Sequence, residues 1–148
     1  MEQQDIEEPR VLIADDDEDV RNGISLVLKL DGYKVWKTKS AKECLEKVEE
    51  LEGRINLVVI NGTIASDRNV ALIINLKRIN PSIKVLVIAD RKEALDKMTI
   101  MDFGADEFAL KPQTLDSIAN KVTMLLLETA IAKTNGANID RMSVSPSG

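Results

Sequence analysis

Short apolar runs alternate along this chain with longer segments in which apolar residues recur with the 3.6-residue period of an α-helix. Most of these runs are continuous in Val, Ile and Leu, which is typical of strands buried on both faces of a parallel sheet. The run Tyr33–Thr38 mixes polar with apolar residues, and we predict a half-exposed strand there. The predicted strands are Arg10–Ala14, Tyr33–Thr38, Ile55–Asn61, Lys84–Ala89 and Asp106–Lys111.

Each predicted strand is followed by a segment with a helical pattern. Gly32 stands just after the first of these segments and is a typical helix stop. Ser40 can cap the second, and Glu43, three residues later, completes a capping box. The predicted helices are Glu18–Leu30, Ser40–Leu51, Asn69–Ile79, Lys92–Phe103 and Thr114–Ala132.

Strands that alternate with helices predict an α/β fold of the (βα)5 type, an open, doubly wound parallel sheet with helices on both faces. The pattern occupies about 120 residues, which is too few for an eight-stranded barrel. We expect a polar N-terminal extension at 1–9 and one folded domain at 10–133. The small, polar residues of 134–148 predict a disordered tail.

The composition of the chain argues against several classes of function. The formal net charge of -5 over 148 residues argues against a protein that binds nucleic acid or anionic membranes. No apolar run approaches the ~20 residues that cross a bilayer, and the acidic N-terminus is unlike a secretory signal. Cys44 is the only cysteine, so we expect it to pack in a core and the protein to be cytoplasmic.

The chain contains no histidine. This excludes a Ser-His-Asp triad, a histidine phosphocarrier and a zinc site with histidine ligands. Any chemistry must therefore depend on carboxylates, lysine, hydroxyl groups and the backbone.

The ends of the predicted strands carry the residues of greatest chemical interest, because ligands bind at the carboxyl edge of an open parallel sheet. In strand order they are Asp15 and Asp16, then Asn61, Ala89 and Lys111. The neighbouring acids at 17–19 are explained by the positive end of a helix dipole. Unpaired carboxylates are costly at the end of a buried strand, so Asp15 and Asp16 need a divalent cation or Lys111 as a partner.

Taken together, these residues resemble the receiver domain of two-component response regulators. VLIADDDEDVR resembles the family's first strand with its acidic pair, and GADEFALKP resembles the segment that leads to its invariant lysine. The resemblance covers about Arg10 to Glu128. It implies a flavodoxin-like sheet with strand order 2-1-3-4-5, and a role in two-component phosphorelay signal transduction.

The resemblance also implies roles for individual residues. Asp16 would bind Mg²⁺ directly, and Asp15 largely through water. The backbone carbonyl of Thr63 would complete the protein ligands, and Lys111 would contact a phosphoryl group. Phe108, three residues before that lysine, takes the place of the family's rotating aromatic residue, although packing in the core would equally explain it.

Two positions depart from the family pattern. Asn61 stands at the phosphoacceptor position, and a neutral amide cannot form the acyl phosphate that a carboxylate forms. Ala89 stands at the switch position and lacks the hydroxyl group that would bind the phosphoryl oxygen. We therefore expect an atypical, non-enzymatic receiver that is not phosphorylated and needs no cofactor, with Mg²⁺ binding weak or absent. The Asn61 NH₂ group can donate to Asp15 or Asp16, and Lys111 can neutralise them.

Other readings stay open at this point. Asn61 could be a substitution in a conventional receiver, or deamidation at Asn61-Gly62 could restore a carboxylate. A small phosphatase of haloacid-dehalogenase type would use the DxD spacing of Asp15 and Asp17, but its later acidic motif is missing. A flavodoxin-like FMN carrier would need N–H groups and hydroxyls after the first strand, where this chain has carboxylates.

If the chain has no chemistry of its own, its function depends on protein contacts. The resemblance implies contacts with a sensor kinase or an effector. It also implies dimerisation through the face of the fourth helix, fifth strand and fifth helix, around 92–101, Phe108 and 116–124. Met124–Ala132 is apolar on more sides than one sheet face requires. Fuller burial or simple helix propensity explains this pattern, and a docking or self-association surface is the alternative.

Overall fold

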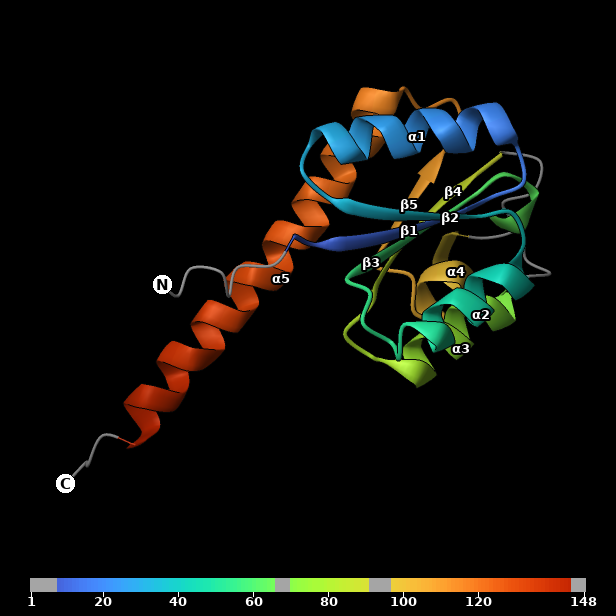
Figure 1. The fold of residues 1–148 in the computed structure, drawn as a ribbon. Helices are drawn as coiled ribbons and strands as arrows, with labels where there is room; N and C mark the ends of the chain where they lie inside the picture. The colour runs from blue at the N-terminus through green and yellow to red at the C-terminus, as the bar shows by residue number, and fades with distance from the viewer. Residues whose placement is uncertain (1–7, 66–69, 91–96, 145–148) are drawn as a thin grey trace.

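The computed structural model describes residues 8–65, 70–90 and 97–144. Strands and helices alternate through the domain (Figure 1). The strands are β1 (Arg10–Asp15), β2 (Lys34–Thr38), β3 (Leu57–Asn61), β4 (Lys84–Ala89) and β5 (Glu107–Leu110). The helices are α1 (Glu18–Leu30), α2 (Ala41–Glu50), the short 3-10 helix η2 (Gly62–Ala65), α3 (Val70–Ile79), α4 (Lys97–Asp102) and α5 (Leu115–Val144).

The five strands form one parallel sheet in the order β2-β1-β3-β4-β5. The predicted α/β fold and strand order are therefore confirmed. Helices α1 and α5 cover one face of the sheet, and α2, α3 and α4 cover the other (Figure 1). The three central strands are buried on both faces, which explains why their sequences are apolar without alternation.

The two faces of the sheet contribute to separate apolar clusters. Leu12 and Val58 face the side of α2 and α3, whereas Val11 and Val59 face the side of α1 and α5. The period-two alternation of a strand produces this division. Cys44 of α2 is fully buried in the first cluster, and this burial raises the pKa of its thiol to about 12. These observations confirm the packing role that we predicted for Cys44.

Local sequence signals determine where the first two helices begin and end. The Asp17 side chain accepts a hydrogen bond from the N–H of Val20, 3.0 Å away, and Gly32 follows α1 with φ of +94°. At α2, Ser40 Oγ accepts from the N–H of Glu43 at 3.1 Å. The Glu43 carboxylate accepts in return from the N–H of Lys39, one residue before the cap, at 3.0 Å.

Helix α5 differs from the expectation. We predicted a helix that ends near Ala132 and a disordered tail at 134–148, but α5 continues through Val144 and projects beyond the domain (Figure 1). Extending an existing helix is much easier than starting one, and no proline interrupts the sequence before Pro146. The expectation is therefore wrong for residues 134–144, while 145–148 lie outside the described residues.

Two other predicted helices have parts that the structure does not describe. Asn69, the predicted start of the third helix, and residues 92–96 of the fourth lie outside the described residues. Across the described ranges, no helix is long and apolar enough to cross a membrane.

The projecting part of α5 should contribute helical content but little stability. Among the α5 side chains that the structure describes, which end at Ala132, Leu125 is the last that is buried in the domain core. A chain that ends at Lys133 should therefore keep its free energy of unfolding within about 0.5 kcal/mol of the full chain, while its far-UV circular dichroism loses helical signal. An unchanged helical signal would show that residues 134–144 are not helical in solution.

Candidate functional site

The carboxyl edge of the sheet brings Asp15 and Asn61 together. The two residues lie opposite each other in the parallel register of β1 and β3. Asn61 Nδ2 donates a hydrogen bond to Asp15 Oδ2 at 2.8 Å, and both side chains are buried, with 2% and 0% of their surface exposed. Sequence analysis left open whether Asn61 binds Asp15 or Asp16, and the structure shows the bond to Asp15.

Further groups hold Asp15 in place. Its Oδ1 atom accepts from the N–H of Asp17 at 2.9 Å, so that both carboxylate oxygens accept a hydrogen bond. Its backbone carbonyl accepts from Arg21 Nη1 of α1 at 2.8 Å. Sequence analysis missed the Arg21 contact, although Arg21 lies one helical turn after the capping residue Asp17, a spacing that turns its side chain back toward the strand end.

Burial is the largest influence on the Asp15 carboxyl, and it raises its pKa above the ordinary value of 3.8. The hydrogen bonds from the Asp17 N–H and the Asn61 amide oppose this shift, since they stabilise the charged form. The negative charge of Asp16 raises the pKa further, and the positive charge of Lys111 lowers it. Removal from water therefore outweighs the favourable contacts.

Only one of the two polar side-chain atoms of Asn61 has a hydrogen-bond partner among the described residues. Nδ2 donates to Asp15, but the buried Oδ1 atom has no hydrogen-bond partner within the described part of the chain. A buried acceptor without a partner costs about 1–3 kcal/mol. The hydrogen bond from Nδ2 to Asp15 therefore orients the Asn61 side chain and leaves its Oδ1 atom without a partner among the described residues.

Asn61 and Lys111 also line one cavity of about 480 Å³ between the sheet and the starts of α1 and α5. Its walls are mostly apolar and include Val20, Leu115 and Ile118. The Lys111 backbone N–H donates to the carbonyl of Ala89 at 2.9 Å, which ties the end of β5 to the end of β4. The half-buried Lys111 side chain is thus held close to the Asp15–Asn61 pair.

The remaining predicted site residues occupy different environments. Asp16 is exposed directly after β1, and Thr63 belongs to η2, immediately after β3. Ala89 is fully buried at the end of β4, and Phe108 is 8% exposed on β5. Both Ala89 and Phe108 belong to the apolar cluster on the α2 and α3 side of the sheet, so Phe108 packs in the core in this structure.

The oxygen donors at this edge fit a divalent cation poorly. A hard cation such as Mg²⁺ requires several oxygen ligands in close to octahedral geometry. Both Asp15 oxygens accept hydrogen bonds from N–H groups, and Asn61 directs an NH₂ group toward them. Among the described residues, no group of three Asp, Glu, His or Cys side chains is placed to hold a metal ion.

The chain was compared with known proteins. A family model, the response regulator receiver domain, matches residues 11–123. The transcriptional regulatory protein PrrA of Mycobacterium tuberculosis is 26% identical over 138 residues, which are 93% of this chain and 58% of PrrA. The response regulator RR06 of Streptococcus pneumoniae is 30% identical over 118 residues, 78% of this chain and 52% of RR06.

A solved structure of a CheY-like receiver domain protein from Methanospirillum hungatei superposes with a TM-score of 0.74 at 23% identity, covering 85% of this chain and 99% of that protein. The chain spans 58% of PrrA and 52% of RR06, little more than half the length of each. The match to the family model covers most of the chain and includes all of the sheet except Arg10, the first residue of β1, together with the site at the carboxyl edge. This chain belongs to the response regulator receiver domain family.

Proposed function

We propose that this receiver domain signals through protein contacts and is not phosphorylated at position 61. The observation that carries the proposal is the buried hydrogen bond from Asn61 Nδ2 to Asp15 Oδ2. Formation of an acyl phosphate needs an anionic carboxylate oxygen that attacks phosphorus. At position 61 the chain instead has a neutral amide, whose donor atom is directed at the neighbouring carboxylate.

The same hydrogen bond supports a pocket that is stable without a metal ion. Asp15 obtains donors from Asn61 and Asp17, and the positive charge of Lys111 lies near enough to lower its pKa. These groups supply part of the compensation that a divalent cation would otherwise provide to a buried carboxylate. Mg²⁺ binding is consequently weak or absent, and the domain needs no cofactor and catalyses no reaction of its own.

Ala89 and Phe108 support the loss of a phosphorylation switch. The Ala89 methyl group cannot donate a hydrogen bond to a phosphoryl oxygen, and it lies in the same apolar cluster as Phe108. We propose that Phe108 stays packed in this cluster and does not couple the site to the surface of the domain. Partner binding then depends on the concentration of the protein, or on a signal other than phosphorylation at position 61.

The surface of α5 supplies a candidate contact face. Met124, Leu127 and Ile131 are 57%, 49% and 50% exposed, and they recur at intervals of three and four residues along one side of the helix. Leu126, by contrast, is partly buried against the core. We propose that this apolar stripe, with the adjoining parts of α4 and β5, mediates a homodimer or the contact with a sensor kinase or effector.

Introducing an acidic residue at position 61 tests whether the amide is what prevents phosphorylation. With Mg²⁺ and acetyl phosphate, Asn61→Asp should gain the mass of one phosphoryl group, whereas the natural chain should gain none. The double variant Asn61→Asp with Asp16→Asn is the matched control, and it should stay unmodified because it lacks a metal ligand. Intact-mass spectrometry measures all three proteins.

Phosphorylation of the natural chain would contradict the proposal. Peptide mapping of the segment around Asn61-Gly62 then separates two causes, since deamidated protein carries a carboxylate at this position. We expect the amide to persist, because the Asn61 side chain is buried and held by Asp15.

The pKa of Asp15 predicts an unusual dependence of stability on pH. Because this pKa is higher in the folded state than the ordinary value of 3.8, the folded protein binds the proton more tightly than the unfolded chain. The contribution of Asp15 to stability is therefore present below pH 3.8 and is lost as the pH rises through the folded-state pKa. Asp15→Asn should remove this loss of stability with rising pH, because an amide does not titrate.

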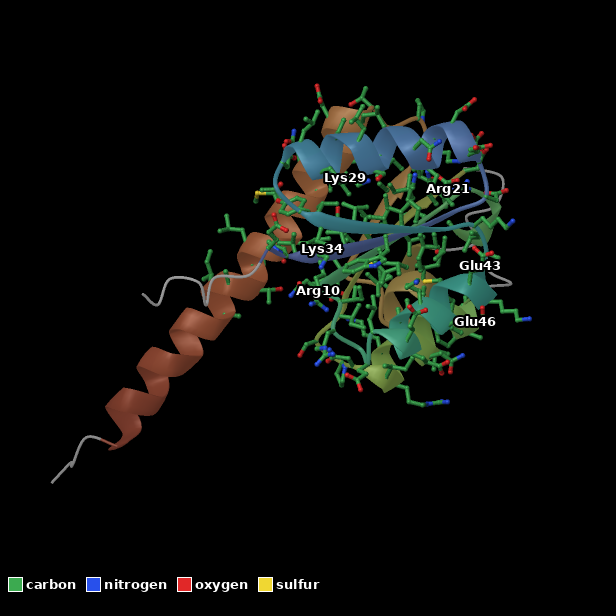
Figure 2. All side chains as sticks on the ribbon, viewed as in Figure 1. Arg10, Arg21, Lys29, Lys34, Glu43 and Glu46 are labelled. Atoms are coloured by element: carbon green, nitrogen blue, oxygen red, sulfur yellow. The ribbon has the colours of Figure 1, made fainter. Side chains whose placement is uncertain are left out.

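Asp15→Asn should also raise the free energy of unfolding at pH 7 by on the order of 1 kcal/mol. An amide at position 15 carries no buried charge and keeps an acceptor for the Asp17 N–H. Its NH₂ group takes the place of Oδ2, so the Asn61 amide turns over and accepts that hydrogen bond through Oδ1. Urea unfolding between pH 4 and 8 measures the effect, with Glu46→Gln on the exposed side of α2 as the control (Figure 2). Equal responses of the two variants would show that Asp15 has no special role.

A charged residue within the α5 stripe should disrupt self-association. Leu127→Glu should convert a dimer to a monomer, because the charge would be buried in an apolar interface. Leu26→Glu is the matched control, since Leu26 is 59% exposed on α1 and lies outside the stripe. Light scattering after size exclusion reports the mass, and an identical mass for both variants and the natural chain would exclude this face as the dimer interface.

A further inference from the structure

Strand β2 lies at one side of the sheet, and its outer edge pairs with no strand among the described residues. In the order β2-β1-β3-β4-β5, it pairs with β1 alone. The backbone N–H of Lys34 donates to the carbonyl of Pro9 at 2.9 Å, which shows which residues of β2 bond to β1. Alternate residues of a parallel ladder direct both backbone groups to the same side. The N–H groups and carbonyls of Val35 and Lys37 therefore point outward, away from β1.

The outward backbone groups of β2 are available to another chain. Helices α1 and α2 lie on opposite faces of the sheet, and β2 is the strand at the front of Figure 1. Within the described part of the chain, the backbone N–H groups and carbonyls of Val35 and Lys37 have no hydrogen-bond partner. A row of such groups along an edge strand is a template for pairing with an extended segment.

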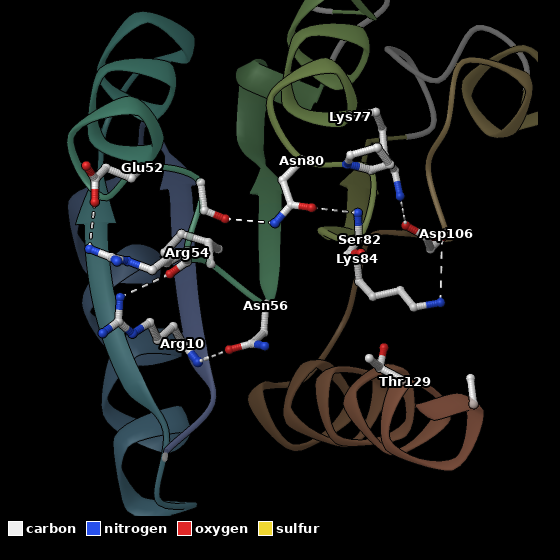
Figure 3. A pocket seen from close by; sticks show the side chains of 14 residues that line it. Arg10, Glu52, Arg54, Asn56, Lys77, Asn80, Ser82, Lys84, Asp106 and Thr129 are labelled. Carbon is white, nitrogen blue, oxygen red and sulfur yellow. Dashed lines mark hydrogen bonds and ion pairs between the residues drawn. The ribbon is translucent and has the colours of Figure 1, made fainter. Parts of the chain in front are cut away.

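The surface beside this edge is positively charged, although the whole chain has a net charge of -5. Lys34 and Lys37 are exposed on β2, and Arg10 lies beside Lys34 on β1. Among the described residues, these three cations form no ion pair. Lys37 Nζ donates to Asn22 Oδ1 at 3.0 Å, and Arg10 Nη1 donates to the carbonyl of Arg54 at 3.2 Å (Figure 3). Both acceptors are neutral, so the positive charges are not compensated.

The only tryptophan of the chain lies between these cations. Cζ of Arg10 is 5.8 Å from the centre of the Trp36 ring, and Nζ of Lys34 is 5.5 Å from it. The three side chains share one face of the sheet, because Arg10 is the register partner of Lys34 and Trp36 is two residues further along β2 (Figure 2). Trp36 is half-buried against the apolar cluster on the α2 side. Tryptophan and arginine are enriched among the residues that dominate binding at protein interfaces.

We propose that the outer edge of β2 binds an extended acidic segment of a partner protein, which adds a strand to the sheet. The backbone groups of Val35 and Lys37 supply the main-chain hydrogen bonds, and the side chains of β2 supply specificity. Carboxylates of the segment lie opposite Lys34 and Lys37, and apolar side chains lie opposite Val35 and Trp36. The pattern of β2 is the same in both directions, so an acid–apolar–apolar–acid sequence fits a parallel or an antiparallel strand.

Charge on the edge selects the partner. Lysines on an edge strand protect it from pairing with a like edge, because two β2 strands side by side would oppose positive charges. An acidic segment meets no such repulsion, so the lysines exclude a second copy of β2 and favour a partner of opposite charge. The proposal extends signalling through protein contacts to a surface that involves neither Asn61 nor the α5 stripe. Leu127→Glu should therefore leave binding at β2 unchanged, so the two contact surfaces are tested independently.

A synthetic peptide with the central sequence Glu-Val-Val-Glu and blocked termini tests the proposal. At low ionic strength, Trp36 fluorescence should saturate with a Kd on the order of 100 μM. Amide hydrogen exchange, followed by NMR, should slow at least about fivefold for Val35 and Lys37 in the saturated complex, because their N–H groups gain partners. The backbone N–H of Trp36 faces β1 and should change little.

Two control peptides separate strand addition from attraction between charges. A Glu-Pro-Pro-Glu peptide has the same charge but lacks N–H groups at its centre, and it should bind at least about fivefold more weakly. A Lys-Val-Val-Lys peptide keeps the N–H groups and reverses the charge, and it should not bind.

Variants of β2 locate the site. Lys34→Gln and Lys37→Gln should each weaken binding of the Glu-Val-Val-Glu peptide about two- to fivefold, the effect of losing an exposed ion pair. Lys37→Pro also removes an outward N–H, which an edge strand tolerates, and should cost at least about threefold more. Lys37→Gln keeps the test decisive if proline lowers stability. Lys121→Gln is the matched control for charge and should bind within about twofold, since Lys121 lies on α5 near Glu107, at the other side of the sheet.

A shortened chain tests whether the protein fills this edge itself. Residues 1–7 lie outside the described residues and contain three carboxylates, which have the charge of the proposed partner. A chain that begins at Glu8 should bind the peptide within about twofold of the full chain. Binding that becomes tenfold tighter would mean that the N-terminal residues occupy the edge, and would overturn the proposal of a separate partner.

Three further outcomes would overturn the inference. They are no saturation by about 5 mM Glu-Val-Val-Glu peptide, equal binding of the Glu-Pro-Pro-Glu peptide, and equal losses in Lys37→Gln and Lys121→Gln. The second would mean that the peptide adds no strand, and the third would mean that only the overall charge of the domain matters.

Discussion

The hydrogen bond between Asn61 and Asp15 is the constraint on which the carboxyl edge of this sheet depends. A strand buried on both faces ends there in a carboxylate that water cannot reach, so donors within the fold must compensate its charge. A second carboxylate at position 61 would place two negative charges side by side and would require a cation between them. The amide removes that requirement, and its NH₂ group joins the N–H of Asp17 as a donor to the Asp15 carboxylate.

The amide at position 61 also bears on the roles of the residues around it. If position 61 is not phosphorylated, as we propose, a hydroxyl at position 89 would have no phosphoryl oxygen to bind. The methyl group of Ala89 instead contributes to the core that also contains Phe108. Asn61 and Ala89 are therefore consistent with each other under the proposed function. The unpartnered Oδ1 of Asn61 is the residual cost of using an amide in a site shaped around a carboxylate.

Much of this arrangement could be predicted from sequence, because parallel strands carry their side chains to a common edge. The apolar runs located all five strands, and their last residues located Asp15, Asn61, Ala89 and Lys111. The pairing of Asn61 with Asp15 depends on strand register, which apolar runs buried on both faces do not specify. The end of α5 was mispredicted because the composition of 134–144 favours disorder, whereas a helix already formed through Ala132 continues at little cost.

Helix α5 connects the two edges of the sheet. Its first turns line the cavity beside Asn61, through Leu115 and Ile118, and its later turns line a cavity at the amino edge of the sheet, through Thr129. A change of charge at either edge could therefore act on the same helix and on the apolar stripe that it exposes. Under the proposed function, position 61 gains no phosphoryl charge. An input to this receiver then reaches the apolar stripe through contacts along α5 and not through a phosphoryl group.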